Sequence, residues 1–310
     1  MEQSSGKMHS AGISPIRGQI VNRLRKGMKR QSPMLATVAP VSLWLLLLVA
    51  IPLLYVLVLS FLSRDANGNV VFRLTLENYA KLFNTEYLRI YGMSLLVAFT
   101  TTIVSVLLAY PFAYHMANGS DRKKVLLMML VIIPFWTNSL IRLYGWKTLL
   151  GASGVVNSLL KGLGLIDKPL ELLFNTPAVV LGMVYTLIPF MILPLYTSIE
   201  KLDKTLLEAA SDLGARRVST FFEITLPHTA AGIFAGSIMV FIPALGYFFV
   251  SDLMGGGNNM LIGNLIKNQF YTARNWPLGA ALSIVLIAVT LLLVKLYQKA
   301  GGDLDDLGVA

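Results

Sequence analysis

KLDKTLLEAASDLGARRVSTFFEITLPHT, residues 201–229, is an amphipathic segment of mixed charge that separates two apolar runs, each long enough to cross a bilayer. Its apolar side chains recur at helical spacing, and Asp203 is placed to cap the first turn. Gly214 breaks this pattern, and Pro227 ends the helical piece that follows. The segment is therefore expected to form two short helices joined by an elbow.

The charged side chains of this segment follow the same period. Glu208, Asp212 and Arg216 fall four residues apart on one face, where an Asp212–Arg216 pair is expected to offset repulsion between Glu208 and Asp212. Two interpretations remain open from the residues alone. The segment is either an interfacial helix that merely connects two spans or a surface on which another protein docks.

The composition is that of a polytopic membrane protein. Apolar residues make up 55% of the 310 residues, charged residues only 14%, and the mean hydropathy is +0.66. The chain has no cysteine, which excludes disulfides, thiol catalysis and thiolate metal sites. Its three histidines, His9, His115 and His228, lack metal-ligand spacing, so no metal site is expected.

Six apolar runs have about the 20 residues needed to cross the hydrocarbon region of a bilayer. We therefore predict an all-α membrane protein whose transmembrane domain, residues 37–299, contains six helices. Between the spans we expect a polar loop at 63–91, a loop at 147–177 with an amphipathic piece from Val155 to Leu163, and a Gly-rich loop at 252–277. The predicted spans are Val38–Leu62, Gly92–Ala117, Val125–Trp146, Ala178–Ile199, Ala230–Ser251 and Leu278–Gln298.

The two ends of the chain differ in charge. Residues 1–36 are basic and lack apolar periodicity, and we expect a disordered cytoplasmic tail, which is also suited to anionic lipid headgroups. Residues 300–310 form a short acidic tail with Asp303, Asp305 and Asp306.

The distribution of basic residues predicts the orientation. With the N-terminus inside, 16 of the 26 Lys and Arg residues fall in inner segments and 10 in outer ones. Both termini and residues 201–229 are then cytoplasmic. The net charge of +10 is accounted for by this asymmetry, and no nucleic-acid partner is expected.

The motif Glu208-Ala209-Ala210, followed by Gly214 and by Ile224-x-Leu226-Pro227, resembles the EAA loop of ABC importer permeases. The resemblance implies a type I permease fold in which residues 200–229, which we call the coupling loop, dock into a groove on a separate ATPase subunit. Glu208 would be the polar anchor, the two alanines would permit close approach, and Gly214 would be the elbow. The coupling residues implied are Glu208, Ala209, Ala210, Asp212, Gly214, Leu226 and Pro227.

Further segments narrow the resemblance within these permeases. Residues 134–142, 187–196, 250–256, 261–264 and 276–277 are similar to the first of the two permeases in spermidine/putrescine importers. The resemblance implies a bacterial cytoplasmic membrane location, a second related permease, two copies of the ATPase and an extracytoplasmic polyamine-binding protein. A permease for another solute, such as an amino-acid derivative or an inorganic anion, is the alternative within this class.

The chain itself shows no site for converting energy. It has no G-x-x-x-x-G-K-[ST] motif, and the triglycine 255–257 lacks the strand and helix that a phosphate loop needs. We predict no catalytic residue and no cofactor in this chain, with ATP and Mg bound by the partner ATPase. A membrane-embedded enzyme would need a convergent set of His, Asp or Glu, which the sequence lacks, and a passive channel would not need the docking motif.

A polyamine needs carboxylates and aromatic faces for its ammonium groups and apolar walls for its methylenes. Phe248 and Asp252 lie one turn apart and share a helix face. Arg142 is expected either to extend to the outer interface or to pair with Asp252 as an outer gate. Asp252 also fits a helix end in water, and Trp136 also fits plain helix packing. The predicted path residues are Trp136, Asn138, Tyr185, Tyr247, Phe248 and Asp252, and the predicted kinks are at Pro134, Pro189 and Pro243.

Overall fold

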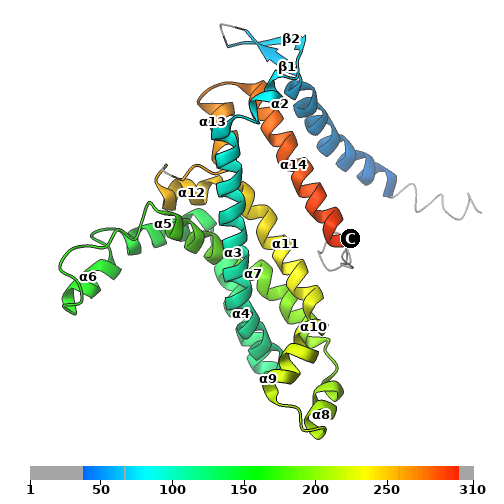
Figure 1. Ribbon diagram of the computed structural model, residues 1–310, viewed down its shortest axis with the longest axis vertical. Helices are drawn as coiled ribbons and strands as arrows, with labels where there is room; N and C mark the ends of the chain where they lie inside the picture. The colour runs from blue at the N-terminus through cyan, green and yellow to red at the C-terminus, as the bar shows by residue number, and fades with distance from the viewer. Residues whose placement is uncertain (1–37, 66–67, 258, 300–310) are drawn as a thin grey trace, which may run out of the picture. The chain divides into compact units, whose positions relative to one another are not determined.

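The computed structural model describes residues 38–65, 68–257 and 259–299, which are mostly helical (Figure 1). The chain divides into two compact units, residues 1–58 and 59–310. The described part of the first unit belongs to the apolar helix Val38–Ser60, in agreement with the first predicted span. The predicted tails lie outside the described residues.

The second unit contains a two-stranded antiparallel sheet and a series of helices. Their bounds are β1 Leu62–Arg64, β2 Val70–Leu74, α2 Glu77–Lys81, α3 Thr85–Ala117, α4 Asp121–Trp136, α5 Ser139–Leu150, α6 Val155–Gly162, α7 Thr176–Glu200, α8 Lys204–Asp212, α9 Arg217–Thr220, the π-helix η1 Phe221–Thr225, α10 Leu226–His228, α11 Ala230–Gly246, α12 Phe248–Gly255, α13 Ile262–Tyr271 and α14 Trp276–Lys299.

Four described helices are long and apolar enough to cross a membrane by themselves: Val38–Ser60, α3, α7 and the first 21 residues of α14. Two further pairs pass the same test only together and are sharply bent. One pair consists of α4 and the stretch Ser139–Gly162, which contains α5 and α6, and is bent by 94°. The other consists of Arg217–His228 and α11 and is bent by 62°. Among the residues that the structure covers, the count of candidate spans is thus four, or six if each bent pair is one span.

The predicted third span, Val125–Trp146, is not one continuous helix. Helix α4 ends at Trp136, and α5 starts at Ser139 in a new direction. Pro134 removes a backbone N–H donor near the end of α4, and Thr137 then adopts an extended conformation. The Asn138 side chain accepts a hydrogen bond of 2.8 Å from the Leu140 N–H and so starts α5 as its N-cap.

The predicted fifth span, Ala230–Ser251, is also wrong as a single helix. Helix α11 ends at Gly246, three residues after Pro243. Tyr247, with ψ 67°, then turns the chain before α12 begins. The second helical piece of the coupling loop ends at His228, one residue beyond Pro227 and in agreement with the prediction, and it includes the π-helical turn η1. Pro189 lies within α7, which is unbroken.

The predicted loops contain more structure than expected. Residues 63–91 include most of the β1–β2 hairpin and α2, which the buried Asn78 ties together by donating to the carbonyls of Ser60 (3.0 Å) and Leu62 (2.8 Å). The predicted Gly-rich loop contains the ten-residue helix α13. The amphipathic piece from Val155 is helical, as predicted.

The main core lies where α3, α7 and α11 pack against one another (Figure 1). Small residues on α11 let it approach α7 closely. A Cβ added to Gly232 would lie 2.5 Å from Ser198 Cβ and 2.8 Å from the Pro194 carbonyl oxygen, and one on Gly236 would lie 2.7 Å from Met191 Sδ. The two glycines are four residues apart on one face, the arrangement that lets membrane helices come close.

Replacing Gly232 with alanine is therefore expected to destabilise the protein. The added methyl group must displace the α7 backbone, and overpacking of this kind costs about 1–3 kcal/mol. Gly92→Ala in α3 is the matched control, because nothing lies within 4 Å of a Cβ at that position. Thermal unfolding of the two variants in detergent should show a lower midpoint for Gly232→Ala alone. Equal midpoints would contradict the close approach.

Candidate functional site

The first helix of the coupling loop, α8, starts as the sequence predicts. Asp203 Oδ1 accepts a hydrogen bond of 2.9 Å from the Thr205 N–H. Hydrogen bonds from the backbone and hydroxyl of Thr205 hold the pKa of Asp203 below its ordinary value, because they favour the charged carboxylate. The N-terminus of α8 is thus capped by an ionised side chain.

The predicted elbow is a left-handed turn at Gly214, whose φ is +77°. The Ala215 N–H donates to the Ala210 carbonyl (2.9 Å), and the Gly214 N–H donates to the Ser211 carbonyl (2.9 Å). These two bonds form a Schellman cap, which ends α8 at Asp212. Gly214 is favoured here because it adopts positive φ without steric cost.

The expected Asp212–Arg216 pair does not form in this geometry. Arg216 lies beyond the elbow, as the N-cap of α9, so the two side chains are no longer one turn apart on a common helix. The ion pairs found in the described part of the chain are Lys81–Glu77, Lys124–Glu200 and Lys267–Asp252.

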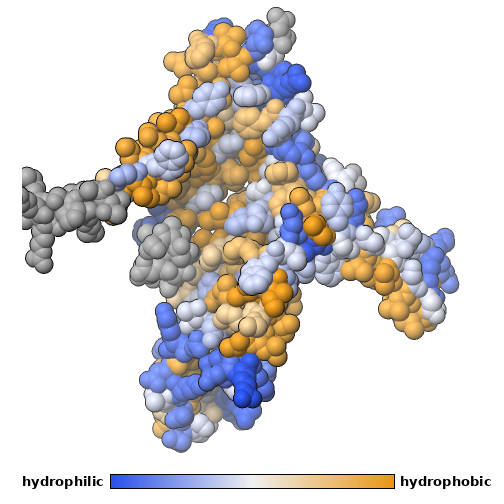
Figure 2. Space-filling model, turned by 180° about the vertical axis from the view of Figure 1, so that it is seen from behind, coloured by the Kyte–Doolittle hydropathy of each residue, from blue (hydrophilic) through white to orange (hydrophobic). Residues whose placement is uncertain are grey.

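The coupling loop presents an uncovered face of mixed character. Glu208, Ala209, Asp212, Gly214 and Pro227 are exposed, Leu226 is half-buried and Ala210 is buried against the loop's own fold. Apolar side chains beside them are also exposed: Leu213 by 89%, Val218 by 69% and Phe222 by 60%. Hydrophilic residues gather around this end of the second unit (Figure 2). The apolar side chains that recur at helical spacing in this segment are therefore still partly uncovered by the described residues.

Both ends of the coupling loop are tied to neighbouring helices. At the start, the Lys124 ammonium at the beginning of α4 pairs with Glu200 at 2.8 Å. At the end, Thr229 shares a hydrogen bond of 2.9 Å with the buried Tyr110 hydroxyl of α3, and the Phe221 ring packs edge-on against Tyr110. The coupling loop is thus held to neighbouring helices at both ends, whereas its middle is exposed.

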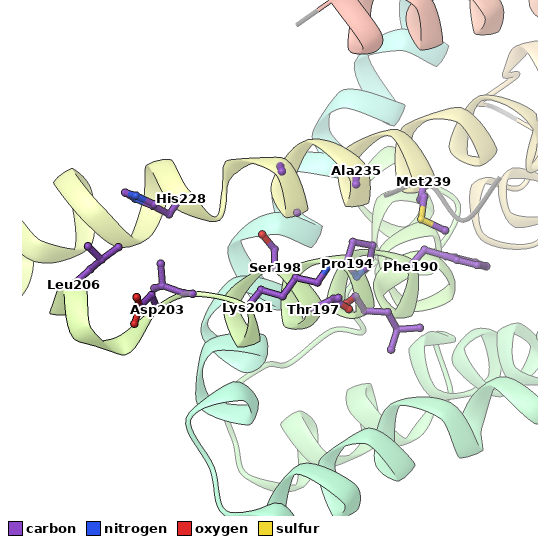
Figure 3. A pocket seen from close by; sticks show the side chains of 14 residues that line it. Phe190, Pro194, Thr197, Ser198, Lys201, Asp203, Leu206, His228, Ala235 and Met239 are labelled. Atoms are coloured by element: carbon purple, nitrogen blue, oxygen red, sulfur yellow. The ribbon is translucent and has the colours of Figure 1, made fainter. Parts of the chain in front are cut away.

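A groove of about 640 Å³ lies between the coupling loop and the spans that it connects (Figure 3). One wall comes from the second half of α7 and the start of the loop, including Pro194, Ser198 and Lys201, and the other comes from His228 and α11. Leu206 of α8 also lines it. Both walls of the groove include residues of the coupling loop. A displacement of α8 is therefore expected to change the shape of the groove.

Arg142, on α5, lies among aromatic rings. Its guanidinium carbon is 5.4 Å from the centroid of the Tyr185 ring and 5.8 Å from that of Phe135. The Tyr185 ring in turn contacts Trp146 edge-on at 5.5 Å. The predicted pairing of Arg142 with Asp252 is not formed in this structure, because the Asp252 carboxylate is occupied by Lys267.

Asp252, on α12, is held by two residues of α13 that the sequence analysis missed. Asn264 Nδ2 donates to Oδ1 at 2.6 Å, and Lys267 Nζ pairs with Oδ2 at 2.5 Å. Lys267 Nζ also lies 5.4 Å from the centroid of the Phe248 ring, so the predicted sharing of a face by Phe248 and Asp252 is confirmed. The apolar spacing of Ile262, Leu265 and Ile266 was the available signal for α13.

The other predicted path residues are spread over the two helix breaks. Trp136 ends α4 and is 82% exposed, and Asn138 caps α5. Tyr247 forms the break between α11 and α12, where its ring lies 5.1 Å from that of Phe249. Helices α5 and α12 pack together, with Leu143 and Val250 in one buried cluster. Of the predicted residues, the structure brings Tyr185 to Arg142 and Phe248 to Asp252. Among the described residues, no side-chain hydrogen bond, ion pair or ring contact joins Trp136, Asn138 or Tyr247 directly to Arg142 or Asp252.

Similar proteins place these features in context. Over 264 residues the chain is 47% identical to the spermidine/putrescine transport system permease protein PotB of Haemophilus influenzae, covering 85% of this chain and 92% of that protein. It is 49% identical over 257 residues to the PotB protein of Escherichia coli K12, covering 83% and 94%.

A solved structure shows the same fold. The chain aligns with a TM-score of 0.72 and 20% identity to a chain in the crystal structure of a bacterial alginate ABC transporter in complex with an alginate pentasaccharide-bound periplasmic protein, over 88% of this chain and 95% of that one. Residues 94–300 match the family described as "Binding-protein-dependent transport system inner membrane component". This chain belongs to that family of inner-membrane transport proteins.

Proposed function

We propose that this chain is the permease subunit of an ATP-driven importer for spermidine and putrescine. The uncovered surface of the coupling loop carries the proposal, because a loop that exposes both a charged residue, Glu208, and the apolar residues Leu213 and Phe222 is suited to docking on another protein. Relatives that are 47–49% identical over most of the chain, and are named as spermidine/putrescine permeases, support the substrate.

The proposed topology is six spans with both termini in the cytoplasm, each bent helix pair counting as one span. The excess of basic residues in the inner segments supports this orientation, and it places the coupling loop on the side where ATP is. The periplasmic protein in the related alginate structure supports a binding protein on the opposite side.

In this mechanism an ATPase subunit moves the coupling loop, and the loop moves the spans. Glu208 anchors the ATPase, Ala209 permits close approach, and Gly214 keeps α8 at a fixed angle. Because the loop continues directly from α7, and Thr229 at its other end is buried and hydrogen-bonded to Tyr110 of α3, force on α8 reaches the core helices instead of being lost in a flexible connection. Two ATPase copies, which bind ATP and Mg, and a second related permease complete the proposed assembly.

The chemistry around Asp252 fits a cationic substrate. A carboxylate beside an aromatic ring attracts an ammonium group through charge and through the ring quadrupole. An inorganic anion would instead require a path lined with Lys or Arg that lack acidic partners. Lys267 is paired with Asp252, whereas Arg142 has no acidic partner among the described residues. The polyamine is therefore preferred over an anion on the names of the relatives and not on these charges.

Glu208→Lys is expected to abolish spermidine uptake while the protein remains in the membrane. The substitution reverses the charge of the proposed anchor, whose side chain is exposed in the described part of the chain. The measurement is uptake of radiolabelled spermidine by cells that lack the chain, complemented at matched membrane levels. Glu171→Lys is the control, because Glu171 is also exposed but lies between α6 and α7, outside the coupling loop.

The outcomes of this experiment separate the alternatives. Normal uptake by Glu208→Lys would remove the docking hypothesis, and uptake that continues without ATP would favour a passive channel. If wild type restores no polyamine uptake with its partner subunits present, the substrate assignment is wrong and a permease for another solute becomes the better proposal.

Asp252→Asn is expected to reduce uptake of the trication spermidine by about tenfold, which corresponds to about 1.4 kcal/mol, and uptake of the dication putrescine by less. The substitution preserves the size of the side chain but removes the charge, whose attraction grows with the charge of the substrate. Competition between the two labelled polyamines measures the difference. Asp167→Asn, at an exposed position before α7, is the control, and equal losses for both substrates would argue against recognition by charge.

A further inference from the structure

The two carboxylate oxygens of Asp252 have partners of different kinds. Oδ1 accepts a hydrogen bond from Asn264, whose side chain is buried and also donates to the Phe248 carbonyl at 3.0 Å. The Asn264 side-chain oxygen accepts from the Leu261 N–H at 3.1 Å, so the amide is engaged on both sides. Asn264 therefore fixes the direction in which Asp252 presents Oδ2.

Oδ2 is occupied by an ammonium group of the protein itself. Lys267 Nζ lies 2.5 Å from this oxygen and 5.4 Å from the Phe248 ring centroid. The side chains of Lys267 and Asp252 remain 30% and 38% exposed, so this chain encloses neither of them. A partly exposed pair that includes a long, flexible lysine contributes little to stability and is readily exchanged.

Space for an aliphatic chain adjoins Lys267 and Phe248, although Asp252 does not itself line it. A cavity of about 410 Å³ is bounded by Phe248 and Lys267 at one side and by apolar side chains of α13 and α14 elsewhere. Its apolar walls include Ile266, Phe270, Leu286 and Ile287. A methylene chain is suited to such walls, while an ammonium at its end needs the carboxylate and the ring.

We propose that Asp252 and Phe248 form a binding site for a primary ammonium group of an aliphatic polyamine, and that Lys267 is a tethered cation that occupies this site until the substrate displaces it. The inference rests on the proposed function and deepens it. It names the substrate group that binds, a primary ammonium, and the side chain of the protein that competes with it, Lys267. Displacement exchanges one ammonium for another at Oδ2, so the charge balance at Asp252 is unchanged. In the substrate-free state, Lys267 keeps the carboxylate neutralised and excludes inorganic cations.

The test is equilibrium binding of radiolabelled spermidine to the complete purified transporter without the binding protein. Lys267→Met removes the competing charge and keeps a side chain of similar length. It is expected to tighten spermidine binding by at least about threefold, because Asp252 is then no longer occupied by Lys267 in part of the molecules. In the Asp252→Asn background the same substitution should give no gain. Lys81→Met is the matched control, since it removes a lysine from another exposed ion pair.

The opposite results would overturn the inference. Unchanged or weaker binding by Lys267→Met, a gain that persists in the Asp252→Asn background, or no detectable binding to any variant each mean that Lys267 only joins α12 to α13. If Lys267→Met reduces the amount of assembled transporter, Lys267→Gln takes its place. Spermidine accumulation by wild-type proteoliposomes, with binding protein and internal ATP, tests the proposed function separately, because its absence removes the substrate itself.

Discussion

The close approach of α11 to α7 is the constraint on which the rest of the second unit depends. Gly232 and Gly236 place the α11 backbone against Met191, Pro194 and Ser198, where any larger residue meets atoms of α7. With these two helices fixed, α3 packs against both. The coupling loop connects α7 to α11, so the same packing sets the distance that the loop spans. Its exposed middle is a consequence of having both ends anchored in a rigid core.

The sequence predicted the parts of this fold that rest on local signals. Asp203 and Gly214 act within one helical turn, and the structure confirms the cap and the elbow. The six apolar runs were visible because each is long, but hydropathy averages over a run and does not report its direction. Proline supplied a signal of direction at two of the three predicted kinks, since α4 ends two residues after Pro134 and α11 ends three residues after Pro243, whereas α7 continues through Pro189. The size of each bend was not predicted, because it depends on tertiary packing.

The candidate site also combines features that local sequence signals predicted with features that depend on tertiary packing. Phe248 and Asp252 were predicted to share a face because four residues make about one helical turn. The Lys267–Asp252 pair was not predictable, because it depends on how α12 and α13 pack against each other. In addition, α13 lies in a glycine-rich segment that was predicted to be a loop. The predicted Arg142–Asp252 pair is absent from this structure for a related reason. Arg142 and Asp252 lie on short helices beyond the breaks, and their directions follow from tertiary packing.

Helix α7 connects the two candidate sites physically. Near its beginning, Gly182 lies where α5 and α12 meet, because a Cβ there would be 2.9 Å from Val250 and 3.3 Å from Leu143. At its end, Glu200 pairs with Lys124 and leads into the coupling loop. The helix is unbroken over its whole length, although it contains Pro189 and Pro194, and the 18 residues between the two points span about 27 Å. In the proposed mechanism, α7 would therefore join the coupling loop directly to the helices that carry Arg142 and Asp252, because it is one continuous helix that contacts α5 and α12.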